Sequence, residues 1–438
     1  MARGGGEVAK KRRNPLRWVL LLLLLLVVGV PLTADQLGVR RVSGLDFPAS
    51  DPLAADLRKR VGKLASAEWA GRKPGLEGNA EAALYLAAAM RDAGLDPLPS
   101  LGGFLMPLVE PTRKVPTRLG HNVVGWLPAT EAPPAGAPPA PVILLGAHFD
   151  HVGPTPEGML LGADDNASSV AVLLAATPLL KAMGARRHPV MVVFFNTEEP
   201  PYFGTPNMGS LTFARTDPPV ELGAPPRVKL AVILDLLGGV VWRAGSDLLL
   251  AAGAEKARGL GAVVDGVSED GLEVRRLGIH MIENIPGRTS LPVSDYHVFR
   301  ERQLPFLFLS SGRTPRYHRP TDLPETLHYD RMARSARWIT KLVAAVDAAP
   351  EFPFEPDLLD LRKDVQSMLA VLDRAVTPEI SIPGTSPMSL AQLYGDRRRI
   401  QRMTAEGYNF SRADEIALER AGFRLQCLLW SMPICFTL

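Results

Sequence analysis

The sequence predicts an α/β fold with a mostly parallel central sheet and helices on both of its faces. Four short runs of consecutive apolar residues have the length of buried strands, and stretches with helical periodicity separate them. The composition agrees with a folded globular chain, because 46% of the 438 residues are hydrophobic and 22% are charged. The net charge of +3 is small, so no nucleic-acid partner is expected.

The N-terminus has the features of an export signal. Basic residues between positions 10 and 17 precede an uncharged apolar stretch from Trp18 to Ala34. This stretch is at the lower limit of the ~17–25 residues that span a bilayer. We expect residues 1–34 to be a basic segment followed by an uncleaved single-pass anchor helix, and residues 35–50 a linker, with the rest outside the cytoplasm at the cell membrane. A periplasmic or secreted protein, released by signal cleavage, is the alternative.

Helical periodicity opens the body of the chain. Apolar residues recur every three or four positions in Leu53–Leu64 and in Asn79–Ala93, and Gly94 closes the second run. We expect outer helices there, then a strand over 122–127 and a Pro/Ala-rich loop over 132–141.

Each of the four apolar runs is followed by a side chain that can bind a metal ion. The runs and the side chains that follow them are Val142–Gly146 with His148, Val190–Phe195 with Glu198, Leu230–Leu234 with Asp235, and Pro305–Leu309 with the loop that contains His318. Open parallel sheets bind ligands beyond the carboxyl ends of their strands. We therefore expect these side chains to converge, although they are spread over 170 positions.

Two imidazoles and three carboxylates form a nitrogen and oxygen ligand set that suits zinc. They are His148, Asp165, Glu199, Asp235 and His318, and two further carboxylates, Asp150 and Glu198, stand close to ligands in the sequence. Such a set indicates hydrolysis by a water that the metal activates. Both cysteines, Cys427 and Cys435, lie in the last dozen residues, which excludes a thiolate zinc site in the main body and leaves one C-terminal disulfide open.

From about Asp51 to Ala348 the chain resembles the co-catalytic zinc aminopeptidases, whose relatives include glutamate carboxypeptidases, glutaminyl cyclases and receptor domains without catalysis. The resemblance implies the zinc-exopeptidase, phosphorylase/hydrolase-like fold for a catalytic domain over 51–350. The motifs that carry it are GAHFDHVG at 146–153, GADDNASS at 162–169, FFNTEEPPYFGT at 194–205 and YHRPTDLPETLHYDRM at 317–332, with weaker echoes in GRKPGLEG at 71–78, MGS at 208–210 and SDYHVF at 294–299.

The resemblance also implies two zinc ions and assigns their ligands. Asp165 would bridge the ions, with His148 and Asp235 on one of them and Glu199 and His318 on the other.

Asp164 is the rival for the bridging role. Asp165 is preferred because the family's bridging carboxylate stands three positions before the small residue that is Ser168 here. Asp164 would then be a turn residue or a helix cap.

Two carboxylates remain for roles other than binding metal. Glu198, next to the ligand Glu199, is the expected general base that takes a proton from the water. Asp150 stands two positions after His148 and is expected to orient that imidazole.

Other polar residues near the motifs receive no ligand role. Three further histidines are expected to pack or to contact the ligand side chains without binding metal, because the five ligand places are already filled. They are His151, His297 and His328. Tyr317 adjoins His318, and its hydroxyl could equally assist the tetrahedral intermediate or pack.

These expectations define an exported zinc metallopeptidase, an aminopeptidase that acts on peptides with a free N-terminus. The alternatives are a glutaminyl cyclase-like acyltransferase, which in the resembling family generally uses one zinc ion, and a receptor-like domain without catalysis. A carboxypeptidase would need a basic pocket, for which Arg313, Arg316 and Arg319 are candidates.

Beyond the resemblance, residues 351–438 are expected to form a helical extension of unknown role. Leu358–Val376 has helical periodicity, and Cys427–Leu438 is an apolar tail that is too short to span a membrane. The tail is expected to pack on the catalytic domain or on a partner subunit, with a second membrane contact as the alternative.

Overall fold

The computed structural model describes residue 47 and residues 49–430, apart from 110–117, 133–135, 137, 217–218, 224–226, 242, 284–290 and 376–386. The expected anchor helix, most of the linker and Cys435 lie outside the described residues. Among the helices that the structure does describe, none is long and apolar enough to cross a membrane.

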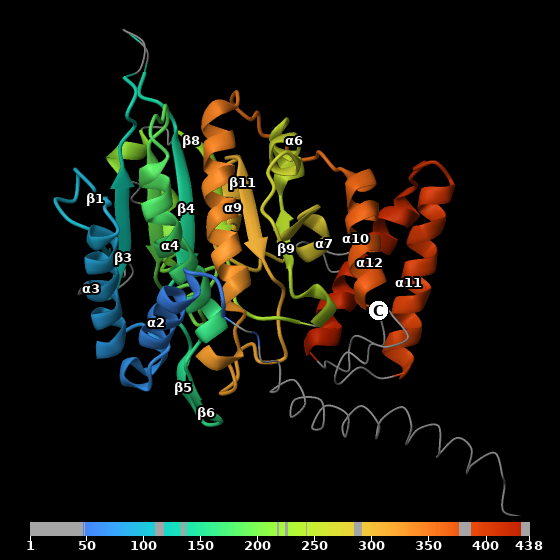
Figure 1. The fold of residues 1–438 in the computed structure, drawn as a ribbon, viewed down its shortest axis with the longest axis horizontal. Coiled ribbons are helices and arrows are strands. Elements are labelled where there is room, and N and C mark those ends of the chain that lie inside the picture. The colour runs from blue at the N-terminus through green and yellow to red at the C-terminus, as the bar shows by residue number, and fades with distance from the viewer. Residues whose placement is uncertain are drawn as a thin grey trace, which may run out of the picture.

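A nine-stranded sheet forms the centre of the described fold (Figure 1). Its strands follow the order β1-β3-β7-β4-β8-β11-β9-β10, and β2 pairs with β3. They are β1 (Asp96–Pro97), β2 (Leu105–Val109), β3 (Arg118–Leu127), β4 (Val142–His148), β7 (Val190–Phe195), β8 (Val228–Leu234), β9 (Leu248–Ala252), β10 (Glu273–Leu277) and β11 (Phe306–Ser310), and β5 (Gly153–Thr155) pairs separately with β6 (Gly158–Leu160).

The parallel part of the sheet is its centre. Strands β7, β4, β8 and β11 are parallel neighbours, and they are the four apolar runs of the sequence. Strand β3 is antiparallel to β7, and β9 is antiparallel to β11. The edges therefore depart from the parallel arrangement, whereas the predicted parallel sheet is confirmed for the strands that precede the candidate ligands.

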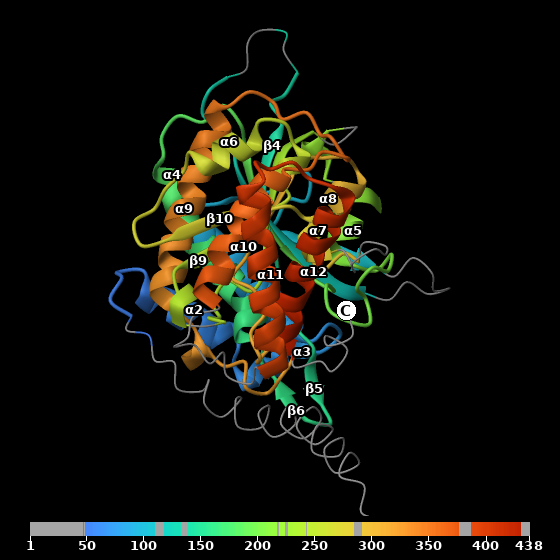
Figure 2. The same ribbon diagram turned by 90° about the vertical axis from the view of Figure 1, so that its right-hand side faces the viewer.

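Helices cover both faces of this sheet, as predicted. The helices are α2 (Ala54–Leu64), α3 (Glu77–Asp92), α4 (Ser169–Ala182), α5 (Gly209–Leu211), α6 (Leu260–Asp265), α7 (His280–Glu283), α8 (His297–Glu301), α9 (Tyr329–Ala348), α10 (Leu361–Ala375), α11 (Pro387–Ala405) and α12 (Arg412–Trp430). Figure 2 shows α4 and α9 on one side of the molecule and the shorter α5 and α8 on the other.

Alternate residues of each central strand supply the two cores. Along β4, Ile143 and Leu145 are buried with the long helices, while Leu144 is buried in the second core with residues such as Phe213 and Phe299. All seven residues of β4 are buried, as expected for a strand with both faces covered.

The C-terminal helices α10, α11 and α12 pack together beyond the β9–β10 edge of the sheet (Figures 1 and 2). Their shared core includes Met368, Leu372 and Leu418, together with Leu277 of β10 and Met281 of α7. The described residues after position 360 thus form helices that are docked on the main sheet.

A buried polar cluster contributes to this docking. His280 of α7 lies 3.0 Å from Asp364 of α10 and 3.6 Å from Glu419 of α12. Glu255 lies nearby and accepts a hydrogen bond from the Ile279 backbone N–H. Burial opposes a charge on His280, but these carboxylates raise its pKa to about 9, and burial raises the pKa of Glu255 to about 7.

We expect the docking of the extension to weaken at alkaline pH. A histidine pKa raised from 6.5 to about 9 contributes stability that is complete below pH 6.5 and lost as the pH rises through 9. The raised pKa of Glu255 acts in the same direction between pH 4.5 and about 7. Hydrogen exchange of α10 and α12 between pH 6 and 10 should show faster opening at high pH, and H280Q should flatten the part of this dependence above pH 7. If H280Q showed the same pH dependence of opening as the unmodified protein, His280 would not be the group responsible.

Candidate metal centre

The side chains that the sequence singled out meet at one edge of the sheet. His148 is the last residue of β4, Asp235 directly follows β8, and Glu198 and Glu199 lie in the turn after β7. His318 comes from the loop after β11. These are the carboxyl ends of neighbouring parallel strands, which is why residues distant in the sequence converge.

Asp165 reaches the same place from the turn that precedes α4, a π-helical segment over Ala163–Ser168. The backbone there is tightly folded, because Gly162 has a φ of +62° and a Cβ at this position would lie 2.1 Å from the Asp165 carbonyl oxygen. Glycine is therefore required for the turn that presents Asp165.

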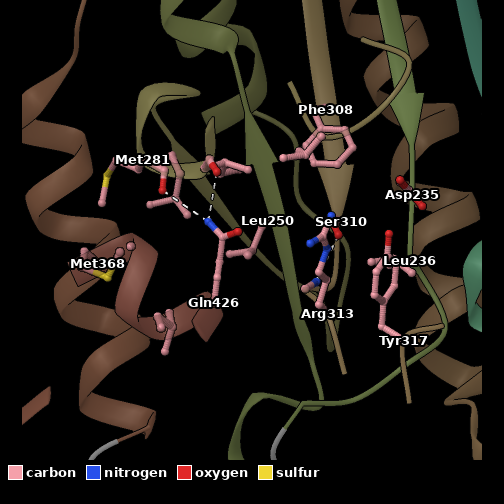
Figure 3. A pocket seen from close by; sticks show the side chains of 16 residues that line it. Asp235, Leu236, Leu250, Met281, Phe308, Ser310, Arg313, Tyr317, Met368 and Gln426 are labelled. Atoms are coloured by element: carbon pink, nitrogen blue, oxygen red, sulfur yellow. Dashed lines mark hydrogen bonds between the residues drawn. The ribbon is translucent and has the colours of Figure 1, made fainter. Parts of the chain in front are cut away.

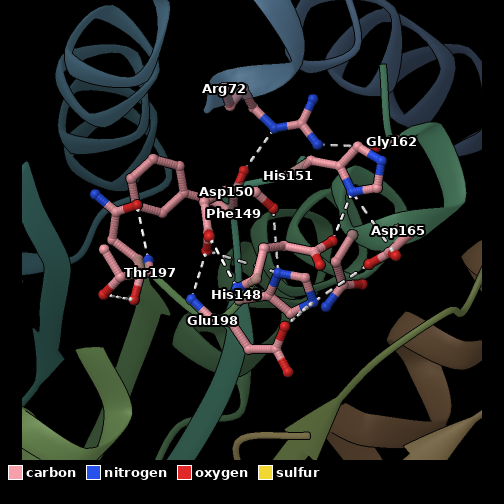
Figure 4. Close-up of polar contacts among 12 residues, drawn as sticks. Arg72, His148, Phe149, Asp150, His151, Gly162, Asp165, Thr197 and Glu198 are labelled. Atoms are coloured by element: carbon pink, nitrogen blue, oxygen red, sulfur yellow. Dashed lines mark hydrogen bonds and ion pairs between the residues drawn. The ribbon is translucent and has the colours of Figure 1, made fainter. Parts of the chain in front are cut away.

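Two groups of potential ligand atoms result, and Asp165 belongs to both. Within each group all ligand atoms lie within 4.8 Å of one another. The first group contains His148, Asp165 and Asp235, and the second contains His151, Asp165, Glu199 and His318 (Figure 4 shows part of both).

The spacing of these atoms fits zinc. Two ligands that are ~2.0–2.1 Å from a tetrahedral ion stand about 3.3–3.4 Å apart. His148 Nε2 lies 3.4 Å from Asp165 Oδ1 and 3.5 Å from Asp235 Oδ1. His318 Nε2 lies 3.1 Å from Asp165 Oδ2 and 3.1 Å from Glu199 Oε2.

Two buried carboxylate oxygens in the cluster face candidate imidazole ligands. Asp165 Oδ2 lies 3.1 Å from His318 Nε2 and Asp235 Oδ1 lies 3.5 Å from His148 Nε2, but neither oxygen accepts a well-directed hydrogen bond from a described residue. A buried carboxylate oxygen without a well-placed partner is costly. A divalent cation would interact with both oxygens, so the residues present fit a zinc centre.

Burial and crowding perturb the ionisation of this region. Burial raises the pKa of Glu198 well above its usual range, although nearby His148 opposes the shift, and the carboxylates of Asp295, Glu199 and Asp235 raise it further. Burial likewise raises the pKa of Asp295 to about 7. The site therefore crowds carboxyl groups that repel one another when ionised, and a bound cation would relieve this repulsion.

The structure separates the two neighbouring aspartates. Asp164 Oδ1 accepts hydrogen bonds of 2.8 Å from the backbone N–H groups of Gly238 and Gly239. Asp164 therefore holds the loop after β8. Of the two, only Asp165 belongs to the groups of potential ligands.

Asp150 shapes the turn that carries both glutamates. Its two carboxylate oxygens accept hydrogen bonds of 3.1 Å from the backbone N–H groups of Glu198 and Glu199. Its contact with His148 differs from the expected one, because the nearest atom to His148 Nδ1 is the Asp150 backbone oxygen at 3.2 Å, whereas the carboxylate Oδ1 is 3.8 Å away. Asp150 thus contacts the His148 ring with its backbone carbonyl group, and its side chain binds the backbone N–H groups of the two glutamates.

Glu198 adjoins the cluster without belonging to either ligand group. It is 7% exposed, and its Oε2 lies 3.8 Å from His148 Nε2. This position leaves its carboxylate able to face a water molecule at the metal centre.

His151 lies closer to the centre than the sequence indicated. Its Nδ1 is 2.8 Å from Glu199 Oε1 and 3.7 Å from Asp165 Oδ2. Contact with Glu199 agrees with the expected supporting role, since ligand carboxylates are themselves commonly hydrogen-bonded.

Arg72 and Asp322 hold the backbone beneath the ligands, and sequence reasoning assigned neither of them a role. The Arg72 guanidinium is fully buried and donates to four backbone oxygens, including those of Phe149 and Gly162 (Figure 4). The Asp322 carboxylate accepts from the backbone N–H groups of Asp164 and Asp165, at 2.8 and 3.1 Å. Arg72 lies in the motif at 71–78 and Asp322 in the motif at 317–332, and these motifs were the sequence signals that could have pointed to the two residues.

Asp295 is a further carboxylate that the sequence did not single out. It is completely buried and interacts electrostatically with His148, Asp150 and Asp235. Asp295 belongs to the SDYHVF motif, and this motif was the sequence signal that could have indicated its place at the site.

The remaining candidates lie outside both ligand groups. His297 Nδ1 contacts the Ser294 backbone oxygen at 2.9 Å, and His328 caps the start of α9. The Tyr317 ring stacks on His318 with centroids 3.9 Å apart, and Arg313 lies over that ring at 4.4 Å.

An α/β sheet with a zinc-fitting cluster at the carboxyl ends of its strands defines a zinc-exopeptidase type of fold. Residues 122–343 match the model of peptidase family M28, and this match covers half of the chain. The chain therefore belongs to peptidase family M28.

The individual proteins and structures that the chain resembles share less than a third of its residues. The uncharacterized protein YfbL of Escherichia coli is 29% identical over 218 residues, which are 45% of this chain and 65% of that protein. The chain thus spans just under two thirds of that relative's length.

Among solved structures, the LapA aminopeptidase of Legionella pneumophila aligns with a TM-score of 0.50 and 16% identity, over 68% of this chain and 73% of LapA. The glutaminyl cyclase of Tannerella forsythia aligns with a TM-score of 0.48 and 18% identity, over 69% of this chain and 100% of that protein.

Proposed function

We propose that the protein is a zinc-dependent aminopeptidase that hydrolyses the N-terminal peptide bond of its substrates. The observation that carries the proposal is the pair of ligand groups that share Asp165, with Glu198 beside them and outside both. Membership of peptidase family M28 supports a metallopeptidase.

The ligand geometry supports two ions per chain. His148, Asp165 and Asp235 would hold one zinc ion, and Asp165, Glu199 and His318 would hold the other. Bound zinc lowers the pKa of a coordinated water to ~7 and polarises a substrate carbonyl.

Glu198 supplies the proton transfers. A general base works best when its pKa lies near the operating pH, and burial moves the pKa of Glu198 upward from that of an ordinary carboxyl. Glu198 would take a proton from the attacking water and deliver it to the departing amine. Asp150 accepts a hydrogen bond from the Glu198 backbone N–H and so fixes the backbone that carries this carboxylate.

We also propose that the catalytic domain faces away from the cytoplasm on a membrane anchor. The support is the sequence of residues 10–34, where basic residues precede an apolar stretch. Release into the periplasm or medium by signal cleavage is the alternative. Fractionation followed by N-terminal sequencing distinguishes the two, since cleavage would remove the apolar stretch from the mature protein.

The first experiment combines metal analysis and an activity panel on the full-length protein in detergent. We expect about two zinc ions per chain, and chelator-sensitive release of amino acids from substrates with a free amine only. About one zinc ion with cyclisation of N-terminal glutamine would favour the cyclase alternative. Release only from substrates with a free carboxylate would favour a carboxypeptidase, and absence of bound metal would contradict the proposal.

A further inference from the structure

A cavity opens beside the metal centre, between the sheet and the C-terminal helices (Figure 3). Asp235 and Tyr317 line it on the side of the metal centre, and Phe308 of β11 and Leu250 of β9 form its floor on the sheet. The far wall consists of Met281 and Ile282 of α7 and of side chains from α10 and α12.

The contribution of the extension to this wall is specific. Met368 of α10 and Leu425 and Gln426 of α12 all line the cavity. These residues lie beyond position 343, where the match to the family model ends. The extension therefore completes a cavity that the family domain would leave open on this side.

The wall is held firmly in place. Gln426 Nε2 donates to the backbone oxygens of Met281 and Ile282, at 3.5 and 3.2 Å. At Gly422 the backbone of α12 lies directly against α7, because a Cβ there would be 2.5 Å from the Met281 oxygen. The pairing of His280 with Asp364 ties α10 to the same short helix.

The lining determines what the cavity can accept. Its residues are mostly aliphatic, aromatic or methionine side chains, and its charged or amide side chains are Asp235, Arg313 and Gln426. Arg313 lies over the Tyr317 ring, and the Gln426 amide nitrogen donates to backbone oxygens. The free space is about 90 Å³. Apolar cavities of ~150 Å³ hold one benzene ring, so this space is on the order of one large side chain.

We infer that α10 and α12 form one wall of a substrate pocket that accepts a large apolar side chain next to the bond to be cleaved. The inference rests on the proposed peptidase function. Asp235 is a candidate metal ligand and also lines the cavity, which is the reason for choosing a substrate side chain as its occupant.

The test reduces the cavity from the side of the extension. M368W in the full-length zinc-loaded protein should lower kcat/KM at least ~10-fold for leucine and phenylalanine anilides and change it little for the alanine anilide, because a change of one methylene in an apolar pocket is already worth ~10–200-fold. Q366W is the matched control, since Gln366 is exposed on the same helix. An unchanged preference in folded M368W would overturn the inference.

A second variant and a second readout protect the test against misfolding. L425A should enlarge the pocket and shift the preference toward bulkier side chains. Calorimetric binding of free phenylalanine, measured against free alanine, reports on the pocket without turnover. Selective phenylalanine binding that M368W abolishes, in a protein without peptidase activity, would retain the pocket and reject the proposed function.

The chain's own apolar segment 431–438 is the other candidate occupant. If it filled the cavity, its removal would raise kcat/KM for all anilides alike and M368W would then not alter selectivity. That outcome would overturn the inference, whereas kcat/KM values that removal leaves unchanged for every anilide would support it.

Discussion

Replacing Glu198 by glutamine should leave the zinc content unchanged and lower kcat at least ~10²-fold, as loss of a general base implies. The amide keeps the shape of the side chain but cannot accept the proton. Glu198 lies outside both ligand groups, so no metal contact is removed. Zinc per chain and kcat on the preferred anilide, measured on the same sample, give both values.

The control for this variant is E157Q, which changes an exposed carboxyl after β5. It should keep the rate of the unmodified protein. If E198Q also kept that rate, another group would have to move the proton, and Glu198 would be removed from the mechanism.

Replacing Asp165 by asparagine should reduce both metal content and rate. Asp165 is the one carboxylate shared by the two described ligand groups, and its two oxygens face His148 and His318. Loss of an outer-shell partner already costs ~10–100-fold in metal affinity, and a shared ligand should cost more. We expect less than one zinc ion per chain after dialysis, measured by elemental analysis, and a loss of rate larger than that of E198Q.

The neighbouring variant D164N is the sharpest comparison. Asp164 accepts hydrogen bonds from the backbone N–H groups of Gly238 and Gly239, so its replacement should lower the melting temperature while folded molecules still bind zinc. Normal zinc in D165N together with zinc loss in D164N would transfer the bridging role to Asp164.

The central strands could be predicted because their environment is simple. A strand with both faces covered must be apolar along its whole length, and the runs at Val190–Phe195 and Leu230–Leu234 coincide with β7 and most of β8. Strand β10 was missed because Glu273–Leu277 is a partly exposed edge strand with two arginines and gives no such run. The antiparallel direction of β3 also has no local signal, since it depends on which neighbour the strand pairs with.

The site divides in the same way. Ligands have to be histidines or carboxylates whatever the surroundings, so His148, Asp165 and Glu199 could be named from motifs and their order. Arg72 and Asp295 could not be assigned a role, because an arginine that binds backbone oxygens and a buried carboxylate look like surface residues in a sequence.

The sequence by itself determined the chemistry of the centre. The residue types indicate which metal can bind, and their positions directly after apolar runs indicate at which edge of the sheet it would bind. Only the tertiary structure decided which groups Asp164 binds and how the extension meets the cavity. Asp164 and Asp165 are identical side chains in adjacent positions, and only the turn geometry directs Asp165 toward His148. Met368 reaches the cavity through packing between helices that are distant in sequence from the motifs, and such packing leaves no local pattern.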